Sequence, residues 1–144
     1  MNVKIKKLSP DAMVPARAHE SDLGYDVVAT SREEIAPNVW KYGIGIAFEP
    51  DEYLKYGNIG ISFHPRSSVW KTGLILSNCE GLIDKDYRGE VSAIFYKVAP
   101  GEIYEVGDRI GQLMLTASAD IEFEVVDELS ETTRGDGGYG STGR

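Results

Sequence analysis

Apolar and polar positions alternate along much of this chain, and helical periodicity is nearly absent. Four short runs have a period of two, which is typical of strands that turn one face toward a core. Their apolar positions are Ile44, Ile46 and Phe48; Ile59, Ile61 and Phe63; Val91, Ala93 and Phe95; and Ile121, Phe123 and Val125. The third run stays apolar on both faces as far as Val98, which favours a central strand. The pattern predicts an all-β protein of short strands.

Turn-forming residues separate these runs. They are Ala36-Pro37-Asn38, Glu49-Pro50-Asp51, Ala99-Pro100-Gly101 and Val106-Gly107-Asp108. Many short strands with such punctuation predict a jelly-roll-like β-barrel or sandwich. One short helix is expected near residues 67–72. The sequence has neither an internal repeat nor a second domain. We therefore predict a single domain over residues 1–144, with a β core over residues 1–129.

The C-terminal segment, residues 130–144, is rich in glycine. Ordering a residue costs about 1–2 kcal/mol of backbone entropy. We therefore expect a mobile arm that orders only when a ligand or a partner subunit supplies contacts. A floppy terminus is the simpler interpretation. A phosphate cradle with an aromatic lid is the other, because arginines, a tyrosine and hydroxyls lie among closely spaced backbone N–H groups from Arg134 onward.

The charge balance narrows the classes of partner. The chain carries 15 Lys and Arg against 23 Asp and Glu, a net charge of −8. Such a chain has no general attraction for nucleic-acid backbones or anionic membranes, so we expect neither as a partner. A polyanionic ligand would need local arginines or a metal ion. No apolar run is long enough for a signal peptide or a membrane span, so we expect a soluble cytoplasmic protein, in the host cell if its origin is viral.

Cysteine and histidine are scarce. Cys79 is the single cysteine, which fits a reducing compartment, and we expect it to be a small buried residue rather than a nucleophile. His19 and His64 are too few for a histidine-built metal site.

Polar residues follow the second alternating run as Pro65-Arg66-Ser67-Ser68. Serine hydroxyls and amides at the start of a helical turn can bind an anion, and Arg66 adds positive charge. An ordinary helix cap explains the same serines, and this segment alone favours the cap.

Residues 81–90 (GLIDKDYRGE) place two carboxylates beside an aromatic ring, between glycines. Asp84 follows two apolar residues, which puts it at a strand end. A carboxylate there can hold a water molecule or take its proton. A hairpin turn with solvated Lys85 and Asp86 explains the segment equally well.

A third acidic segment has Asp22 and Asp26 on either side of Gly24-Tyr25. It could be a loop near a magnesium ion, but an Asx turn is the safer interpretation. The chain lacks both the GxxxxGK[ST] and the strand–GxGxxG–helix patterns, which argues against the common phosphate-binding folds.

Taken in order, these segments resemble the five-motif pattern of the trimeric dUTP pyrophosphatase family. The similar segments are residues 21–29 (SDLGYDVVA), 65–68 (PRSS), 81–90, 109–113 (RIGQL) and 134–143 (RGDGGYGSTG). The resemblance implies a β jelly roll that forms a homotrimer with active sites shared between subunits. It also implies Mg²⁺-assisted attack of water at the α-phosphate of dUTP, giving dUMP and pyrophosphate. That activity limits uracil in DNA and supplies dUMP for dTMP synthesis.

The same resemblance assigns roles to individual residues. Asp84 would activate or orient the attacking water, and Tyr87 would pack under the deoxyribose and exclude a 2′-hydroxyl. Asp26 would act on the metal through water. The uracil edge would bind Asn78 and the backbone of Gly81, Leu82 and Ile83. The phosphates and the closing arm would involve Arg66, Ser67, Ser68, Gln112, Arg134, Gly138, Tyr139, Gly140, Ser141 and Thr142, with Tyr139 covering the uracil ring.

Four positions depart from the family pattern, and none removes a reacting group. Ser68 stands where glycine is usual, Leu23 where a small residue is expected, Gly111 for alanine and Tyr139 for phenylalanine.

Two alternatives remain at the level of sequence. A dCTP deaminase-like enzyme on the same fold shares the Arg66-Ser67-Ser68 segment, but it needs a glutamate where this chain has Ile94. A nucleotide-binding regulator on the same scaffold would bind dUTP without hydrolysing it.

Overall fold

The structure is a computed structural model that describes residues 2–50 and 58–138. These residues form strands in three antiparallel sheets and one short 3-10 helix, η1. The elements are β1 (Val3–Lys7), β2 (Tyr25–Val28), β3 (Ser31–Ala36), β4 (Val39–Gly43), β5 (Ile46–Pro50), β6 (Asn58–Pro65), η1 (Val69–Thr72), β7 (Leu74–Leu76), β8 (Gly81–Ile83), β9 (Ser92–Lys97) and β10 (Arg109–Ser118). In the described ranges, no helix has the length and apolar character needed to cross a membrane.

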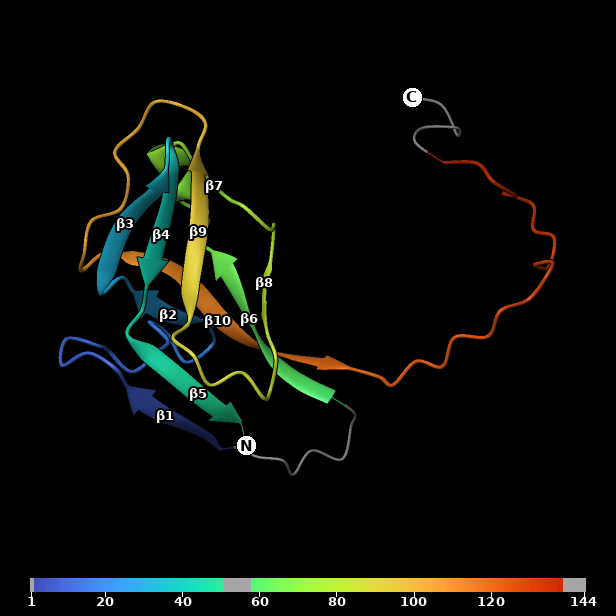
Figure 1. Ribbon diagram of the computed structural model, residues 1–144, viewed down its shortest axis with the longest axis horizontal. Coiled ribbons are helices and arrows are strands. Elements are labelled where there is room, and N and C mark those ends of the chain that lie inside the picture. The colour runs from blue at the N-terminus through green and yellow to red at the C-terminus, as the bar shows by residue number, and fades with distance from the viewer. Residues whose placement is uncertain (1, 51–57, 139–144) are drawn as a thin grey trace.

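Two four-stranded sheets form the body of the molecule, in the orders β2-β10-β6-β8 and β3-β4-β9-β7. A two-stranded sheet, β1-β5, lies beside them (Figure 1). The two larger sheets pack face to face, because Phe63 of β6 and Phe95 of β9 meet edge-to-face with ring centroids 6.3 Å apart. The fold class predicted from alternation, a jelly-roll-type sandwich of short strands, is confirmed.

Aromatic rings fill the centre of this sandwich. Phe95 also meets Tyr42 and Tyr104 edge-to-face, at 5.8 Å and 6.1 Å between centroids. The hydroxyl of Tyr42 donates a hydrogen bond to the carbonyl of Tyr104 (3.1 Å). Burial raises the pKa of Tyr42 to about 12 and also raises the pKa of Tyr104. Both phenols therefore stay neutral at physiological pH, and no charge enters the core.

Three of the four alternating runs face the core as predicted, and β9 is an interior strand of its sheet. In the first run, Ile44 and Ile46 are both buried, although a break precedes β5. Gly45 lies at this break with φ 68°, a conformation that favours glycine, and it redirects the chain from β4 into β5. The expected short helix is η1.

The strand predicted over residues 121–125 is wrong. The last strand ends at Ser118, and the chain then leaves the sheets as an extended arm (Figure 1). Along it Ile121, Phe123 and Val125 are 70%, 87% and 98% exposed. Alternation marks a segment suited to pairing, but the arm has left the sheets, so these side chains remain in solvent. The sheet structure therefore ends before residue 129.

The central position of Phe95 predicts a large effect of its removal. Phe95→Ala should lower the free energy of unfolding by about 3–5 kcal/mol, because it removes a fully buried ring and leaves a cavity. Urea denaturation at one protein concentration measures the loss. Tyr96→Ala, on the outer face of the same strand, is the matched control and should cost about 1 kcal/mol or less. Equal losses would contradict this view of the core.

Candidate active site

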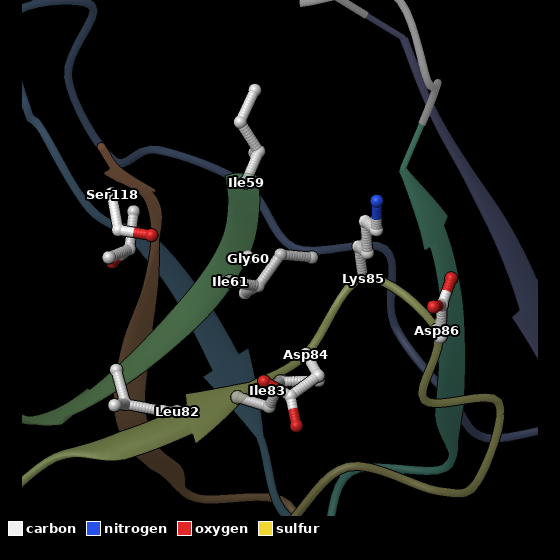
Figure 2. Close-up of a pocket in the computed structure, with 10 residues that line it drawn as sticks. Ile59, Gly60, Ile61, Leu82, Ile83, Asp84, Lys85, Asp86 and Ser118 are labelled. Carbon is white, nitrogen blue, oxygen red and sulfur yellow. The ribbon is translucent and has the colours of Figure 1, made fainter. Parts of the chain in front are cut away.

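Asp84 lies directly after β8, where the sequence predicted a strand end, and it is exposed. It lines a cleft of about 530 Å³ together with Gly60 of β6 and Leu82 of β8. Lys85 and Asp86 line the same cleft, but their side chains turn away from Asp84 (Figure 2). Water can therefore reach the carboxylate, as a role in holding or deprotonating a water molecule requires.

The loop that follows Asp84 is held in shape by its own hydrogen bonds. The backbone N–H of Tyr87 donates to the carbonyl of Asp84 (3.0 Å). The hydroxyl of Tyr87 donates to the carbonyl of Glu90 (3.0 Å). Glu90 is tied to the sandwich, because its carboxylate accepts the N–H of Gly45 (2.8 Å). A Cβ at Gly89 would lie 2.4 Å from the hydroxyl oxygen of Tyr87, so glycine leaves room for the ring. The half-exposed ring of Tyr87 is thus positioned before any ligand binds.

The turn before β8 carries Asn78, which is exposed and two residues from the end of β7. The next residue, Cys79, is exposed at φ 60°, so the expectation that it is buried is wrong. Cys79 lies in the turn between β7 and β8, which places its side chain outside the sandwich. Gly81 pairs with Phe63, and a Cβ on it would lie 3.1 Å from the Cβ of Phe63. Asn78, Gly81, Leu82 and Ile83 therefore follow one another along the same sheet edge.

Arg66 and Ser68 line a second cleft, of about 650 Å³. Lys71 and Arg109 add positive charge there, and the acidic residues Glu102, Glu105 and Asp108 add negative charge. Ser68 occupies the N-cap position of η1 but makes no side-chain capping hydrogen bond. The ordinary capping explanation therefore does not account for Ser68, and the neighbouring Ser67 is exposed.

Asp26 lies between two side chains of β10. Its carboxylate accepts from the guanidinium of Arg109 (2.9 Å) and from the amide of Gln112 (3.3 Å). Gly24 is needed beside this group, because a Cβ there would lie 2.7 Å from Oε1 of Gln112. The carboxylate of Asp26 thus binds both the guanidinium of Arg109 and the amide of Gln112, and it orients that amide.

Direct metal ligation finds little support in the part of the chain that the structure describes. Residues 2–50 and 58–138 contain no group of three or more His, Cys, Asp or Glu side chains arranged to hold a metal ion. The carboxylate of Asp22 accepts the N–H of His19 (2.9 Å), and the N–H of Asp22 donates to the carbonyl of His19 (3.0 Å), so Asp22 closes a turn over residues 19–22 that differs from the predicted Asx turn. Mg²⁺ commonly keeps several waters and binds through substrate phosphates, so an indirect contact of Asp26 fits this arrangement.

The predicted site residues separate into two groups within one chain. Ile83, the neighbour of Asp84, pairs with Ile61 of β6. Arg66 lies five residues further along the chain, about 16 Å away at the rise of an extended strand. Reacting groups must come within about 3–3.5 Å. Within one chain, Asp84 and Arg66 therefore lie toward opposite ends of β6, with backbones much further apart than groups that act on one phosphate.

The arm, residues 119–138, extends away from the sheets that carry both groups (Figure 1). Arg134 on this arm is exposed, and its Nε donates to the carbonyl of Gly137 (2.8 Å). Gly138 is also exposed, on the same arm. The predicted residues Tyr139, Gly140, Ser141 and Thr142 lie outside the described residues.

Sequence reasoning missed two hydroxyl residues of the first cleft, Thr116 and Ser118. They follow Gln112 along β10 at even spacing, so a period-two extension from Gln112 would have found them.

Comparison with known proteins gives consistent matches. A sequence model of the dUTPase family matches residues 11–143. The chain is 40% identical to deoxyuridine 5′-triphosphate nucleotidohydrolase of Corynebacterium glutamicum, over 99% of this chain and 95% of that protein. It is 40% identical to the Rhodococcus erythropolis protein of the same name, over 99% and 87%. The solved dUTPase of Staphylococcus bacteriophage 80alpha with dUpNHpp has a TM-score of 0.81 at 24% identity, covering 99% of both chains.

The hydroxyl of Tyr87 predicts a measurable effect on the loop. Tyr87→Phe removes the hydrogen bond to Glu90, so amide hydrogen exchange over residues 84–90 should become roughly five-fold faster. Mass spectrometry or NMR measures the rates. Tyr96→Phe, which changes the same chemistry on β9, should leave the loop unaffected. Unchanged exchange in Tyr87→Phe would show that the hydroxyl does not hold this loop.

Proposed function

This chain belongs to the dUTPase family and hydrolyses dUTP to dUMP and pyrophosphate, and we propose that its active sites are assembled between the subunits of a homotrimer. The observation that carries the proposal is the separation of Asp84 from Arg66 within one chain. One subunit then supplies the nucleoside half-site around β8. A second supplies the phosphate half-site around residues 65–68.

The nucleoside half-site has the chemistry to bind deoxyuridine. β8 is an edge strand, so one side of its backbone is free to meet the hydrogen-bonding edge of a base. Asn78 and the backbone of Gly81, Leu82 and Ile83 would read uracil there. The ring of Tyr87, held by Glu90, would lie under the deoxyribose and leave no room for a 2′-hydroxyl.

Asp84 would perform the central proton chemistry. Its exposed carboxylate at the strand end can accept a proton from a water molecule, or hold that water in line with the α-phosphorus. The water oxygen then forms the new bond to phosphorus, and pyrophosphate leaves with the electrons of the broken P–O bond.

The phosphate half-site would neutralise the substrate. Arg66 supplies charge, Ser67 and Ser68 supply hydroxyls, and Gln112 supplies an amide that Asp26 orients. Mg²⁺, held by the phosphate oxygens and touched by Asp26 through water, would withdraw charge from the reacting phosphate. The third subunit would contribute its arm, with Arg134 at the terminal phosphate, Tyr139 over the base, and Gly138, Gly140, Ser141 and Thr142 around the phosphates.

The deaminase alternative lacks its acid–base residue. Ile94 occupies the corresponding place, and it pairs with Lys41 within the β3-β4-β9-β7 sheet. The family match favours the hydrolase.

Shared sites predict complementation between two inactive variants. Asp84→Asn should retain substrate binding but lose at least about 100-fold in kcat, because the water loses its base. Arg66→Ala should also be strongly impaired, through lost phosphate neutralisation. Subunits of the two variants refolded together should regain activity in about a quarter of the sites by random assortment in a cyclic trimer. Pyrophosphate release from dUTP measures the gain.

The control for that experiment is each variant refolded alone, which should stay inactive. A mixture no more active than its components would mean that each site lies within one subunit.

The arm yields a separate prediction. Deleting residues 134–144 should leave the trimer folded, because the hydrophobic core is formed by residues between Val3 and Leu113, while kcat/KM for dUTP falls at least about ten-fold through lost closure over the site. Sedimentation and circular dichroism report assembly and folding, and pyrophosphate release reports activity. Unfolding of the truncated chain would refute the view of residues 134–144 as a lid.

A further inference from the structure

A row of polar residues crosses the sheet that carries both half-sites. Gln112 of β10 pairs directly with His64 of β6. On the other side of β6, the pairs Ile61–Ile83, Ser62–Leu82 and Phe63–Gly81 set the register with β8. One step further, this register brings Glu80 opposite His64, so both side chains project from the same face of the sheet.

The imidazole of His64 contacts two side chains. Nε2 of His64 lies 3.5 Å from Oε1 of Glu80 and 2.8 Å from the hydroxyl oxygen of Ser62. A serine–histidine–acid catalytic triad would use opposite nitrogens of the imidazole, whereas both contacts here involve the same nitrogen. Ser62 is also 1% exposed, so no substrate reaches its hydroxyl. The contacts of His64 with Ser62 and Glu80 therefore have a structural role rather than a catalytic one.

β8 is the element that this contact can hold. It is a three-residue strand at the sheet edge, paired with β6 on one side, and its side chains are partly or fully exposed. A short edge strand with little buried surface opens easily. The turn that leads into it contains Cys79 at φ 60°. The contact between Glu80 and His64 secures the start of β8, while Asp84 follows its end.

We infer that His64 and Glu80 form a positioning pair that fixes the nucleoside-binding strand β8 against β6. The inference rests on the proposed function, because it assigns the pair to the uridine part of that site. His64 immediately precedes residues 65–68, but that segment follows a strand paired with β10 through eight residues. The phosphate half-site therefore keeps its place without the pair, and only nucleoside binding depends on it.

The test compares Glu80→Ala with the wild-type full-length enzyme. Glu80→Ala should raise KM for dUTP and the inhibition constant of dUMP by the same factor, roughly two- to five-fold, as expected for the loss of one partly exposed side-chain contact. It should leave kcat within about two-fold and inhibition by inorganic pyrophosphate unchanged. Glu80→Gln keeps a side-chain oxygen beside the imidazole. Its KM for dUTP and its dUMP inhibition constant should therefore lie between those of the wild type and Glu80→Ala.

A matched control is Glu34→Ala in the other sheet. Glu34 is also an exposed glutamate beside a turn with a left-handed residue, accepting the N–H of Asn38, whose φ is 63°. Its removal should change none of the kinetic constants. The same changes in Glu34→Ala would overturn the inference, since a general loss of stability would then explain them.

Two further outcomes would overturn it: unchanged KM and dUMP inhibition in Glu80→Ala, or an equal weakening of pyrophosphate inhibition. Failure of the proposed function is recognised separately, as absence of pyrophosphate release from dUTP by the wild-type chain. Amide exchange of residues 81–83 then tests the pair by itself. Faster exchange in Glu80→Ala supports the pair, and unchanged exchange refutes it.

Discussion

The antiparallel pairing of β6 with its two neighbours is the constraint on which the rest of the molecule depends. β10 pairs with β6 through eight residues, and β8 pairs with it through three. The long ladder fixes residues 65–68, and the short ladder fixes Asp84 near the opposite end. The positions of both segments are therefore set by hydrogen bonds along one strand, and their separation follows from the rise of that strand.

This geometry bears on how a chain of net negative charge can bind a triphosphate. The net charge of −8 repels phosphate, so attraction has to be local. Arg66 and Arg109 border the same cleft, and Arg109 is held by Asp26. The carboxylate that pairs with Arg109 also accepts from Gln112, so a single acidic group orients two side chains of β10.

Much of the fold could be predicted from local patterns, because alternation reports a strand with one buried face. Val91, Ala93 and Phe95 are buried as expected, and Asp84 follows a strand as its two apolar predecessors indicated. The same pattern failed for Ile121 to Val125, since alternation does not say whether a neighbouring strand exists. The relative positions of Asp84, Arg66 and Gln112, and the contact of His64 with Glu80, depend on register between distant segments, which no local pattern contains.

The exposed edge of β8 also has a consequence for colloidal behaviour. A strand with an open backbone is a template on which other chains can stack and aggregate. If this edge binds a base, as we propose, it cannot also be covered by a helix or loop. Its short length and the charges around it, Glu80 before the strand and Asp84, Lys85 and Asp86 after it, act as gatekeepers that oppose such stacking. The charged residues on either side of β8 thus also oppose self-association of the folded chain into fibrils.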